Sequence, residues 1–452
     1  MTRRHRRPAA APDGGDPRET PRWTREQAAR IDRTDDTTAP VVYPPAETLD
    51  PDHHVWDTWL VRERDGSVAD VGGYRVVVAL TADSDLLPGK RHDTATLRFY
   101  YSRDGRDWHL GGRLFPDSTA LGSRQWAGSA LYDDGDLYAY YTAAGERGES
   151  DLSYTQHIVL AEGGQLVART GGESPDADDA GVRVEGTFDH HSLLRPDGEW
   201  YEREAQSRGM TYTFRDPWFF EDPATGETYL LFEANTPVPE DSSRCGGDAV
   251  QQEFNGSVGV AHSPTGNPTD FELRPPLLDA VCVNQELERP HVVVRDGRYY
   301  LFVSSHMHTF APGLAGFDAL YGFVADSLRG EYRPLNDSGL VATNPANAPF
   351  QAYSWLAYGH REEVLVTSFV NYTEFDQPSL DDVAFLPESE QRRRFGGTLA
   401  PTLRLRLDGD RTRIVGTLDH GHLPTADEEL PETDDERIER LRHEQGGAGR
   451  GY

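Results

Sequence analysis

Short apolar runs joined by turn residues recur along most of the chain, and they constrain its fold more than any other feature of the sequence. The runs are rich in β-branched and aromatic residues, which is typical of strands, and helical periodicity is scarce. Asp-Gly pairs between neighbouring runs, such as Asp104-Gly105 and Asp296-Gly297, are strong hairpin signals. Blocks of this kind recur about five times, with irregular insertions between them.

This pattern predicts an all-β fold. Several antiparallel modules in one chain are typical of a β-propeller or a β-sandwich, and the residues alone leave both open. A propeller places loops from every module around one axis, so residues far apart in the sequence can share a site. Residues 87–93, LPGKRHD, are expected to form a solvated loop.

The two ends of the chain differ in composition from the region between them. Residues 1–45 are rich in Pro, Arg, Asp and Thr, so we expect them to be mostly disordered apart from a short helix over residues 24–31. Residues 425–452 form an acidic tail that ends in a Gly-rich stretch. The first 16 residues contain arginines without a following apolar segment, so a signal peptide is not predicted.

Charge excludes several classes of partner. The formal net charge is −31, from 76 acidic and 45 basic residues, and Lys90 is the only lysine. Such a surface repels nucleic acid and anionic lipid, so neither is expected as a partner. An arginine-rich genome would explain the missing lysine but not the excess of acid. The two biases together indicate a protein adapted to concentrated salt, where screening relieves self-repulsion.

No apolar run reaches the length that spans a bilayer, so we expect a soluble protein. Cys245 and Cys282 are too far apart for a CxxC redox or zinc motif and can form at most one disulfide. No cofactor is expected.

The first of three acidic stretches is HHVWDTW, in which Asp57 lies between Trp56 and Trp59. Aromatic faces cover the apolar side of a sugar ring, and a carboxylate between them can reach its anomeric carbon. The alternative is that both tryptophans are buried in a strand while Asp57 faces solvent.

The second stretch is FRDPWFFED, in which Asp216 stands between Arg215 and Pro217. Proline disfavours helical backbone at the preceding residue, which predicts an extended conformation for Asp216. The neighbouring guanidinium should lower the pKa of Asp216 and keep it ionised as a hydrogen-bond acceptor. The alternative is a surface ion pair at a strand start.

The third stretch is NQELERPHVV, in which Glu286 and Glu288 are two residues apart and share one face of a strand, while Arg289 points the other way. Two carboxylates on one face raise each other's pKa, which can keep one of them protonated as a general acid. The alternative is a surface pair without function.

In this order and at these separations, the three stretches resemble glycoside hydrolase family 68, the levansucrases and inulosucrases. The acidic, lysine-poor composition makes the chain look most like the inulosucrases of salt-loving archaea within that family. The resemblance extends from about Val55 to Leu403 and includes QWAGSALY, FEAN, PFQAYSWLAY and FGGTLAPTLRL. It implies one catalytic domain over residues 46–424, a five-bladed β-propeller with a funnel-shaped central pocket that binds sucrose.

The resemblance also implies roles for the three carboxylates. Asp57 would be the nucleophile, Glu288 the acid/base, and Asp216 the stabiliser of the transition state. The implied reaction is transfer of fructose from sucrose through a covalent fructosyl-enzyme, which releases glucose and builds fructan or fructooligosaccharides, with inulin-type linkage favoured. The alternatives are a levansucrase that makes levan-type linkage, or a mainly hydrolytic β-fructofuranosidase.

Further residues are implied to wall the sugar, hold its hydroxyls or orient the carboxylates: Trp56, Trp126, Arg215, Glu233, Glu286, His306 and Tyr353. Arg289 would neutralise the acidic cluster, and Trp59 would pack in the core. Ala127 replaces a serine that bonds the nucleophile in many members, so Asp57 would depend more on backbone donors.

Two differences from the family pattern concern metal binding and the location of the protein. Gln285 replaces an aspartate of calcium-binding members, so no metal is expected. Cys245 and Cys282 stand where some calcium-free members carry a disulfide, which implies a bridge and an extracellular location despite the missing signal peptide. The partners would be sucrose and fructan or fructooligosaccharide acceptors, and the protein is expected to be a monomer.

Overall fold

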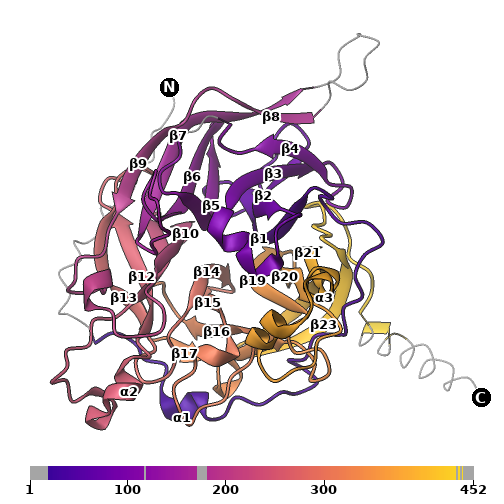
Figure 1. The fold of residues 1–452 in the computed structure, drawn as a ribbon. Helices are drawn as coiled ribbons and strands as arrows, with labels where there is room; N and C mark the ends of the chain where they lie inside the picture. Colours follow the sequence, from indigo (N-terminus) through magenta and orange to yellow (C-terminus); the bar gives the residue numbers. More distant parts are fainter. Residues whose placement is uncertain (1–18, 117–118, 170–180, 434–435, 438–439, 441–452) are drawn as a thin grey trace, which may run out of the picture.

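A computed structural model describes residues 19–116, 119–169, 181–433, 436–437 and 440, and this part of the chain is mostly β-structure (Figure 1). Within these ranges the strands pair into four sheets. The predicted all-β class is therefore confirmed. None of the helices in these ranges is long and apolar enough to cross a membrane.

The first sheet has nine strands and consists of two antiparallel groups. The first group contains β1 (His53–Arg62), β2 (Arg75–Asp83), β3 (Thr96–Ser102) and β4 (His109–Arg113). The second group contains β5 (Arg124–Asp133), β6 (Asp136–Ala144), β7 (Gln156–Arg169), β8 (Gly181–Glu185) and β9 (Asp189–Leu194). A short parallel pairing, Val61 with Ala130 and Arg62 with Leu131, joins β1 to β5 and so connects the two groups.

The other three sheets are antiparallel. One contains β10 (Phe214–Glu221), β11 (Thr228–Asn235), β12 (Gly256–Ser263) and β13 (Glu272–Asp279). The next contains β14 (Glu288–Arg295), β15 (Arg298–Ser305), β16 (Ala319–Ala325), β17 (Arg333–Pro334) and β18 (Leu340–Thr343). The last contains β19 (Ala352–His360), β20 (Glu363–Tyr372), β21 (Phe395–Leu399), β22 (Pro401–Asp408) and β23 (Arg411–His420).

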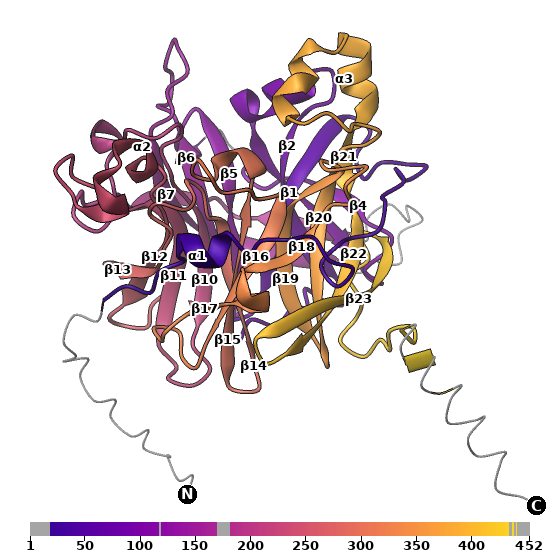
Figure 2. The ribbon, with the colours of Figure 1, turned by 90° about the horizontal axis from the view of Figure 1, so that it is seen from below.

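The helices of the described ranges are short and lie between strands or before the first one. The α-helices are α1 (Arg25–Ala28), α2 (Ala249–Gln252) and α3 (Glu388–Arg394). The 3-10 helices are η1 (Pro88–Thr94), η3 (Glu204–Gln206), η4 (Arg244–Gly247), η5 (Met307–Thr309), η6 (Leu335–Asp337) and η7 (Leu380–Phe385). Figure 2 shows α2 and α3 at one end of the sheets.

The hairpins predicted at Asp-Gly pairs are confirmed. Asp296 and Gly297 form a two-residue turn between β14 and β15 and have φ of 51° and 73°. Positive φ at both central residues is what a type I′ hairpin turn requires, and Asp-Gly accepts it at low energy. Asp104-Gly105 lies in the longer connection between β3 and β4, which pair antiparallel.

The first strands of the successive antiparallel groups, β1, β5, β10, β14 and β19, lie nearest the middle of the molecule (Figure 1). Each of them pairs irregularly with its second strand. The irregularities fall between Val55 and Thr58, Trp126 and Gly128, Arg215 and Trp218, Glu288 and His291, and Tyr353 and Leu356. A β-bulge of this kind re-aims side chains that would otherwise alternate strictly.

The prediction of a mostly disordered segment 1–45 is wrong for residues 19–45, which pack against the sheets. Trp23 is 1% exposed, and its indole N–H donates to Ser338 O at 3.0 Å. The predicted short helix is present as α1, where Thr24 and Gln27 form a capping box. The segment is polar on average, but it contains one large aromatic side chain, Trp23. Burial of this side chain contributes far more to stability than burial of its neighbours does. Residues 1–18 lie outside the described ranges.

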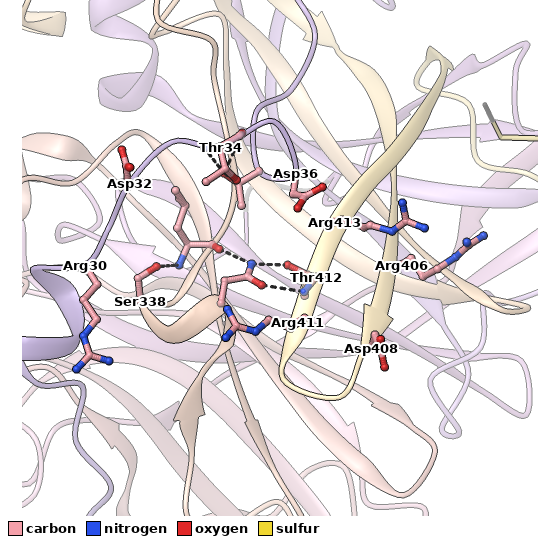
Figure 3. A pocket seen from close by; sticks show the side chains of 13 residues that line it. Arg30, Asp32, Thr34, Asp36, Ser338, Arg406, Asp408, Arg411, Thr412 and Arg413 are labelled. Carbon is pink, nitrogen blue, oxygen red and sulfur yellow. Dashed lines mark hydrogen bonds between the residues drawn. The ribbon is translucent and has the colours of Figure 1, made fainter. Parts of the chain in front are cut away.

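The rest of the N-terminal segment borders a cavity of about 420 Å³ beside β22 and β23 (Figure 3). Its lining is charged and polar: Arg30, Asp32, Thr34, Asp36, Thr37, Asn336, Ser338, Leu340, Arg406, Asp408, Arg411, Thr412 and Arg413. Arg411 pairs with Asp337 at 2.6 Å and Arg406 with Glu436 at 2.9 Å, so these arginines already have partners. The lining shares no residue with the predicted site.

Of the predicted tail, residues 425–433, 436–437 and 440 are described and the remainder lies outside. Arg404 on β22 donates to Pro431 O at 2.6 Å, and Thr433 is buried. The start of the tail therefore lies along the last sheet.

Candidate active site

Asp57 lies in the irregular stretch of β1, where the strict alternation of side chains is broken. Trp56 and Trp59 are 0% and 2% exposed, whereas Asp57 is half-buried. Without the bulge, residues 56 and 59 would point to opposite faces. The bulge buries both indoles and leaves the carboxylate accessible.

Asp216 does not have the extended backbone that its place before Pro217 predicts. Its φ is 59°, in the left-handed region. Its backbone N–H donates to Thr142 Oγ1 at 2.9 Å, and its Oδ2 accepts from the backbone N–H of Arg289 at 3.1 Å. These bonds from two neighbouring sheets, together with the bulge, outweigh the local preference. The first holds the backbone of Asp216 and the second holds its carboxylate.

Thr142 itself links two functional positions. Its hydroxyl donates to Ala127 O at 3.0 Å while it accepts from Asp216. Ala127 offers only a methyl group in place of the hydroxyl that the family resemblance implies for other members, and this methyl is buried. The hydroxyl next to Ala127 is that of Thr142, and it accepts a hydrogen bond from the Asp216 backbone.

The charge of Asp216 depends on burial more than on its arginine neighbour. Burial raises the pKa of Asp216 to about 6, the nearby Asp57 carboxylate adds to the rise, and Arg215 opposes it. The sequence-based expectation of a lowered pKa is therefore wrong. Desolvation of a buried carboxylate exceeds the attraction of a cation whose guanidinium Nε is 4.0 Å away and shared with other acids.

Arg215 joins carboxylates from two sheets. Its Nε donates to Glu233 at 2.7 Å, and its Nη2 donates to Glu286 at 3.2 Å and to Glu288 at 3.1 Å. Glu233 lies opposite Arg215 in the β10–β11 ladder, so strand register brings the pair together. These acids raise the pKa of Arg215 well above its ordinary value, so it stays charged. Glu233 is 0% exposed, which restricts it to orienting Arg215.

Glu288 is half-buried at the start of β14. Tyr353 donates its hydroxyl to one carboxylate oxygen, and His306 Nε2 lies 3.9 Å from the same oxygen. Burial and the nearby Glu286 raise the pKa of Glu288 to about 7, against the opposing charges of His306 and Arg215. A carboxyl group with this pKa can hold a proton near neutral pH and release it, as a general acid requires.

His306 stacks on Tyr353, with ring centroids 3.8 Å apart and planes 16° from parallel. Its Nδ1 lies 2.9 Å from Asp318 Oδ2, and the charge of Asp318 raises the pKa of His306 to about 9 against the effect of burial. The sequence singled out His306 but missed Asp318. The only signal was an aspartate directly before an apolar strand.

The prediction of a solvated loop at residues 87–93 is wrong. This segment forms η1, and the ring of His92 lies 5.4 Å from Trp56 and 6.2 Å from Trp126. The indole N–H of Trp126 donates to His92 O at 3.2 Å. The pairing of β1 with β2 explains why this segment lies at the site. His53 at the start of β1 pairs with Asp83 at the end of β2, so the residues that follow β2 lie at the end of β1 nearer to Asp57. Trp126 is only partly buried, so it is the more accessible of the two predicted sugar-wall rings.

Arg289 contributes to the site mainly through its backbone. Its guanidinium donates to Ser354 O at 3.0 Å, to Ser354 Oγ at 2.6 Å and to Thr58 O. It therefore links β14 to β19 and β1. Its charge lowers the pKa of Asp216, but less than Arg215 does.

Gln285 is 1% exposed, and its amide donates to Thr211 O at 2.9 Å and Asn255 Oδ1 at 3.1 Å. An amide N–H₂ placed this way ties two loops together. Cys245 and Cys282 are joined by a disulfide in the same region. Within the described ranges, no group of three or more His, Cys, Asp or Glu side chains is placed to hold a metal ion.

The chain is similar to known proteins over most of its length. The sequence profile of a family described as Levansucrase/Invertase, glycoside hydrolase family 68, matches residues 15–424. The levansucrase LscA of Pseudomonas savastanoi pv. glycinea is 35% identical over 436 residues, which cover 89% of this chain and 96% of that protein.

Two further relatives are similar to this chain over a comparable share of its length. The extracellular sucrase of Zymomonas mobilis subsp. mobilis is 34% identical over 420 residues, which cover 90% of this chain and 95% of that protein. A solved structure of an inulosucrase from Halalkalicoccus jeotgali bound to kestose is 65% identical, has a TM-score of 0.88, and covers 92% of this chain and 100% of its own. The chain therefore belongs to glycoside hydrolase family 68, the levansucrase/invertase family, as one of its fructosyl-transferring enzymes.

Proposed function

We propose that this enzyme takes fructose from sucrose, releases glucose, and transfers the fructosyl unit to a growing fructan or fructooligosaccharide. The observation that carries the proposal is that Asp57, Asp216 and Glu288, each in or beside the bulge of a different innermost strand, lie close enough for the charge of Asp216 to act with that of Asp57 and on Glu288. Each differs in environment from the others: Asp57 is accessible, Asp216 is fixed by backbone N–H and hydroxyl groups, and Glu288 holds a proton near neutral pH.

These environments suit a retaining double displacement. Glu288 donates its proton to the glycosidic oxygen as glucose leaves, and Asp57 attacks the anomeric carbon of the fructosyl unit to form a covalent ester. The Glu288 carboxylate then removes a proton from the acceptor hydroxyl, which displaces Asp57. Asp216 accepts hydrogen bonds from fructosyl hydroxyls and stabilises the positive charge that develops on the ring.

The proposed binding residues divide by accessibility. His306 and Tyr353 lie against Glu288, and Trp126 is partly buried beside His92. Trp56 is fully buried, with its ring against that of His92. Glu286 and Arg215 orient Glu288 and are available to sugar hydroxyls only at their edges, since both side chains are about 10% exposed.

We further infer that the five antiparallel groups are five propeller blades around a funnel-shaped pocket, with residues 46–424 as the catalytic domain. The weak parallel contact between β1 and β5 supports counting the nine-stranded sheet as two blades. The segment 19–45 packs onto the outside of this domain, and the acidic tail follows it.

Inulin-type linkage is the proposed product, with the acceptor attacking through the 1-hydroxyl of its fructose. The 65% identity to an inulosucrase, against 35% to a levansucrase, supports this choice. Levan-type growth and predominant hydrolysis use the same three carboxylates, so they are the competing outcomes of the test.

We propose that the enzyme acts outside the cell as a monomer. The disulfide between Cys245 and Cys282 suits an oxidising compartment, and a similar sucrase from Zymomonas mobilis is named as extracellular. Sucrose and fructan acceptors are its proposed partners, and no cofactor takes part.

Substitution of Asp57 tests the proposal directly. D57N keeps the size of the side chain but removes the nucleophile, so glucose release from concentrated sucrose should fall by at least about 10⁴-fold. D52N is a matched control, because Asp52 is an exposed carboxylate just before the same strand, and it should retain activity.

Product analysis of the active enzyme separates the alternatives. Linkage analysis by NMR should show fructosyl units joined through the 1-hydroxyl. Joining through the 6-hydroxyl would make the enzyme a levansucrase, and free fructose without oligosaccharide would make it a hydrolase. Glucose release that survived in D57N would overturn the assignment of the nucleophile.

A further inference from the structure

We propose that Asp318 is a positioning residue that keeps His306 in its charged form opposite Glu288, and that it thereby sets the upper end of the pH range in which Glu288 can donate its proton. This inference rests on the proposed role of Glu288 as the acid. It concerns a residue outside the three stretches that the sequence singled out.

The Asp318 carboxylate directs both of its oxygens at the His306 loop. Its side chain is 1% exposed, its Oδ2 lies 2.9 Å from His306 Nδ1, and its Oδ1 accepts the backbone N–H of Met307 at 2.9 Å. Both oxygens therefore serve the turn that begins η5. The backbone carbonyl of Asp318 accepts from Thr343 Oγ1 at 3.4 Å, which ties the position to β18.

His306 has its second nitrogen directed at the acid/base. Nε2 lies 3.9 Å from Glu288 Oε2, on the oxygen that also accepts from the Tyr353 hydroxyl. The ring lies flat against Tyr353, which limits its rotation. A carboxylate at Nδ1 and another at Nε2 favour the imidazolium, since both ring nitrogens then carry hydrogen.

Other charged groups surround this pair. The charge of Glu286 also favours the protonated form of His306, and the ring of His306 stacks on that of His308 with centroids 5.2 Å apart. The charges of Glu286, Arg215 and Asp216 also act on Glu288. Glu286 and Asp216 favour the protonated form of Glu288, whereas Arg215 and His306 favour its carboxylate. Of the two cations, only His306 belongs to a residue type whose ordinary pKa lies near the working range of pH, and Asp318 is its nearest acid.

Removing the charge of Asp318 should therefore act on Glu288 through His306. In D318N the amide can still accept from Met307 N–H and can donate to His306 Nδ1, which stabilises the neutral imidazole. With that cation gone, Glu288 holds its proton more tightly. The basic limb of kcat/KM for sucrose should then move to higher pH by about one unit, a tenfold change in proton affinity.

A double substitution separates this electrostatic route from a structural one. H306R supplies a cation that does not titrate, so adding D318N to H306R should leave the basic limb where H306R alone has it. D326N is the matched control on the same segment, because Asp326 is an exposed carboxylate at the end of β16, and its profile should match the unmodified enzyme. H306Q removes the cation directly and should shift the limb as D318N does, which keeps the test decisive if D318N folds poorly.

Three results would overturn the inference: an unmoved basic limb in folded D318N, an unmoved basic limb in H306Q, or a shift by D318N that persists in the H306R background. Failure of the proposed function looks different. If the unmodified enzyme does not split sucrose, or if E288Q retains its activity, the assignment of the acid fails before Asp318 is tested.

Discussion

At the scale of single residues, the site works by giving carboxylates of similar intrinsic acidity different environments. Asp216 and Glu288 are both partly or fully withdrawn from water, and burial is the largest cause of the raised pKa of each. Their values of about 6 and about 7 leave a narrow interval in which Asp216 is ionised and Glu288 is protonated. Arg215 and the two hydrogen bonds to Asp216 keep these charges fixed in position.

This arrangement predicts a bell-shaped pH profile for kcat/KM with sucrose. Activity should fall as pH rises through about 7, because Glu288 loses the proton that glucose needs, and it should fall as pH drops through about 6, because Asp216 becomes protonated. Initial rates of glucose release across the pH range, at fixed salt, measure both limbs. A profile without a basic limb near neutral pH would contradict the role of Glu288.

At the scale of elements, the shared feature is a bulge in each innermost strand beside a functional residue. Asp216, Arg289 and Ser354 have φ of 59°, 50° and 57° there, a backbone region that non-glycine residues rarely adopt. Such backbone persists only where the surroundings over-determine it. The Arg289 guanidinium provides that restraint by linking its own bulge to the bulge at Ser354 and to Thr58 after the bulge of β1.

R289M should therefore weaken the fold as well as the site. The substitution keeps a long apolar stem but leaves buried acceptors on two neighbouring strands without donors, each worth about 1–3 kcal/mol. We expect the free energy of unfolding to fall by about 3 kcal/mol in denaturant titrations at constant salt. R333M, at an exposed position on β17, should change it by less than about 0.5 kcal/mol. Equal stability of the two variants would show that Arg289 does not hold the bulges.

At the scale of the whole molecule, the charge of −31 on one chain acts against compactness. Screening shortens the reach of this repulsion from about 10 Å in 0.1 M salt to about 3 Å in 1 M salt. Stability should therefore increase strongly with ionic strength.

We expect the melting temperature to rise by at least about 5 °C between 0.1 M and molar NaCl, which corresponds to about 4–5 kcal/mol for a chain of this size. Calorimetry or circular dichroism at neutral pH provides the measurement. Sorbitol equimolar with NaCl is the control for non-ionic solute effects and should raise the melting temperature less. A melting temperature independent of salt would count against adaptation to concentrated salt.

Much of the fold and part of the site could be predicted without coordinates because their causes are local. Asp296-Gly297 specifies its turn through the φ that each residue tolerates, and alternating β-branched and aromatic residues specify the strands on either side. Glu286 and Glu288 are two residues apart and reach the same guanidinium, as the predicted shared face requires, although β14 begins only at Glu288. The acidic excess likewise follows directly from composition.

Local rules failed where distant parts of the chain meet. Proline predicts extended backbone at Asp216, but bonds to Thr142 and Arg289, each more than 70 residues away, hold it in the left-handed region. Average polarity predicts disorder around Trp23, but a site beside Ser338, 315 residues later, buries that indole.

The sequence by itself therefore determined the strands, their turns and the charge, and it singled out the three carboxylates that are proposed to react. The tertiary structure alone decided how these carboxylates are charged and what supports them. Burial of Asp216, the His92 contacts with Trp56 and the Asp318 contact with His306 arise only when separate strands assemble around one site. Desolvation and charge attraction depend on distance in space, which separation along the chain does not specify.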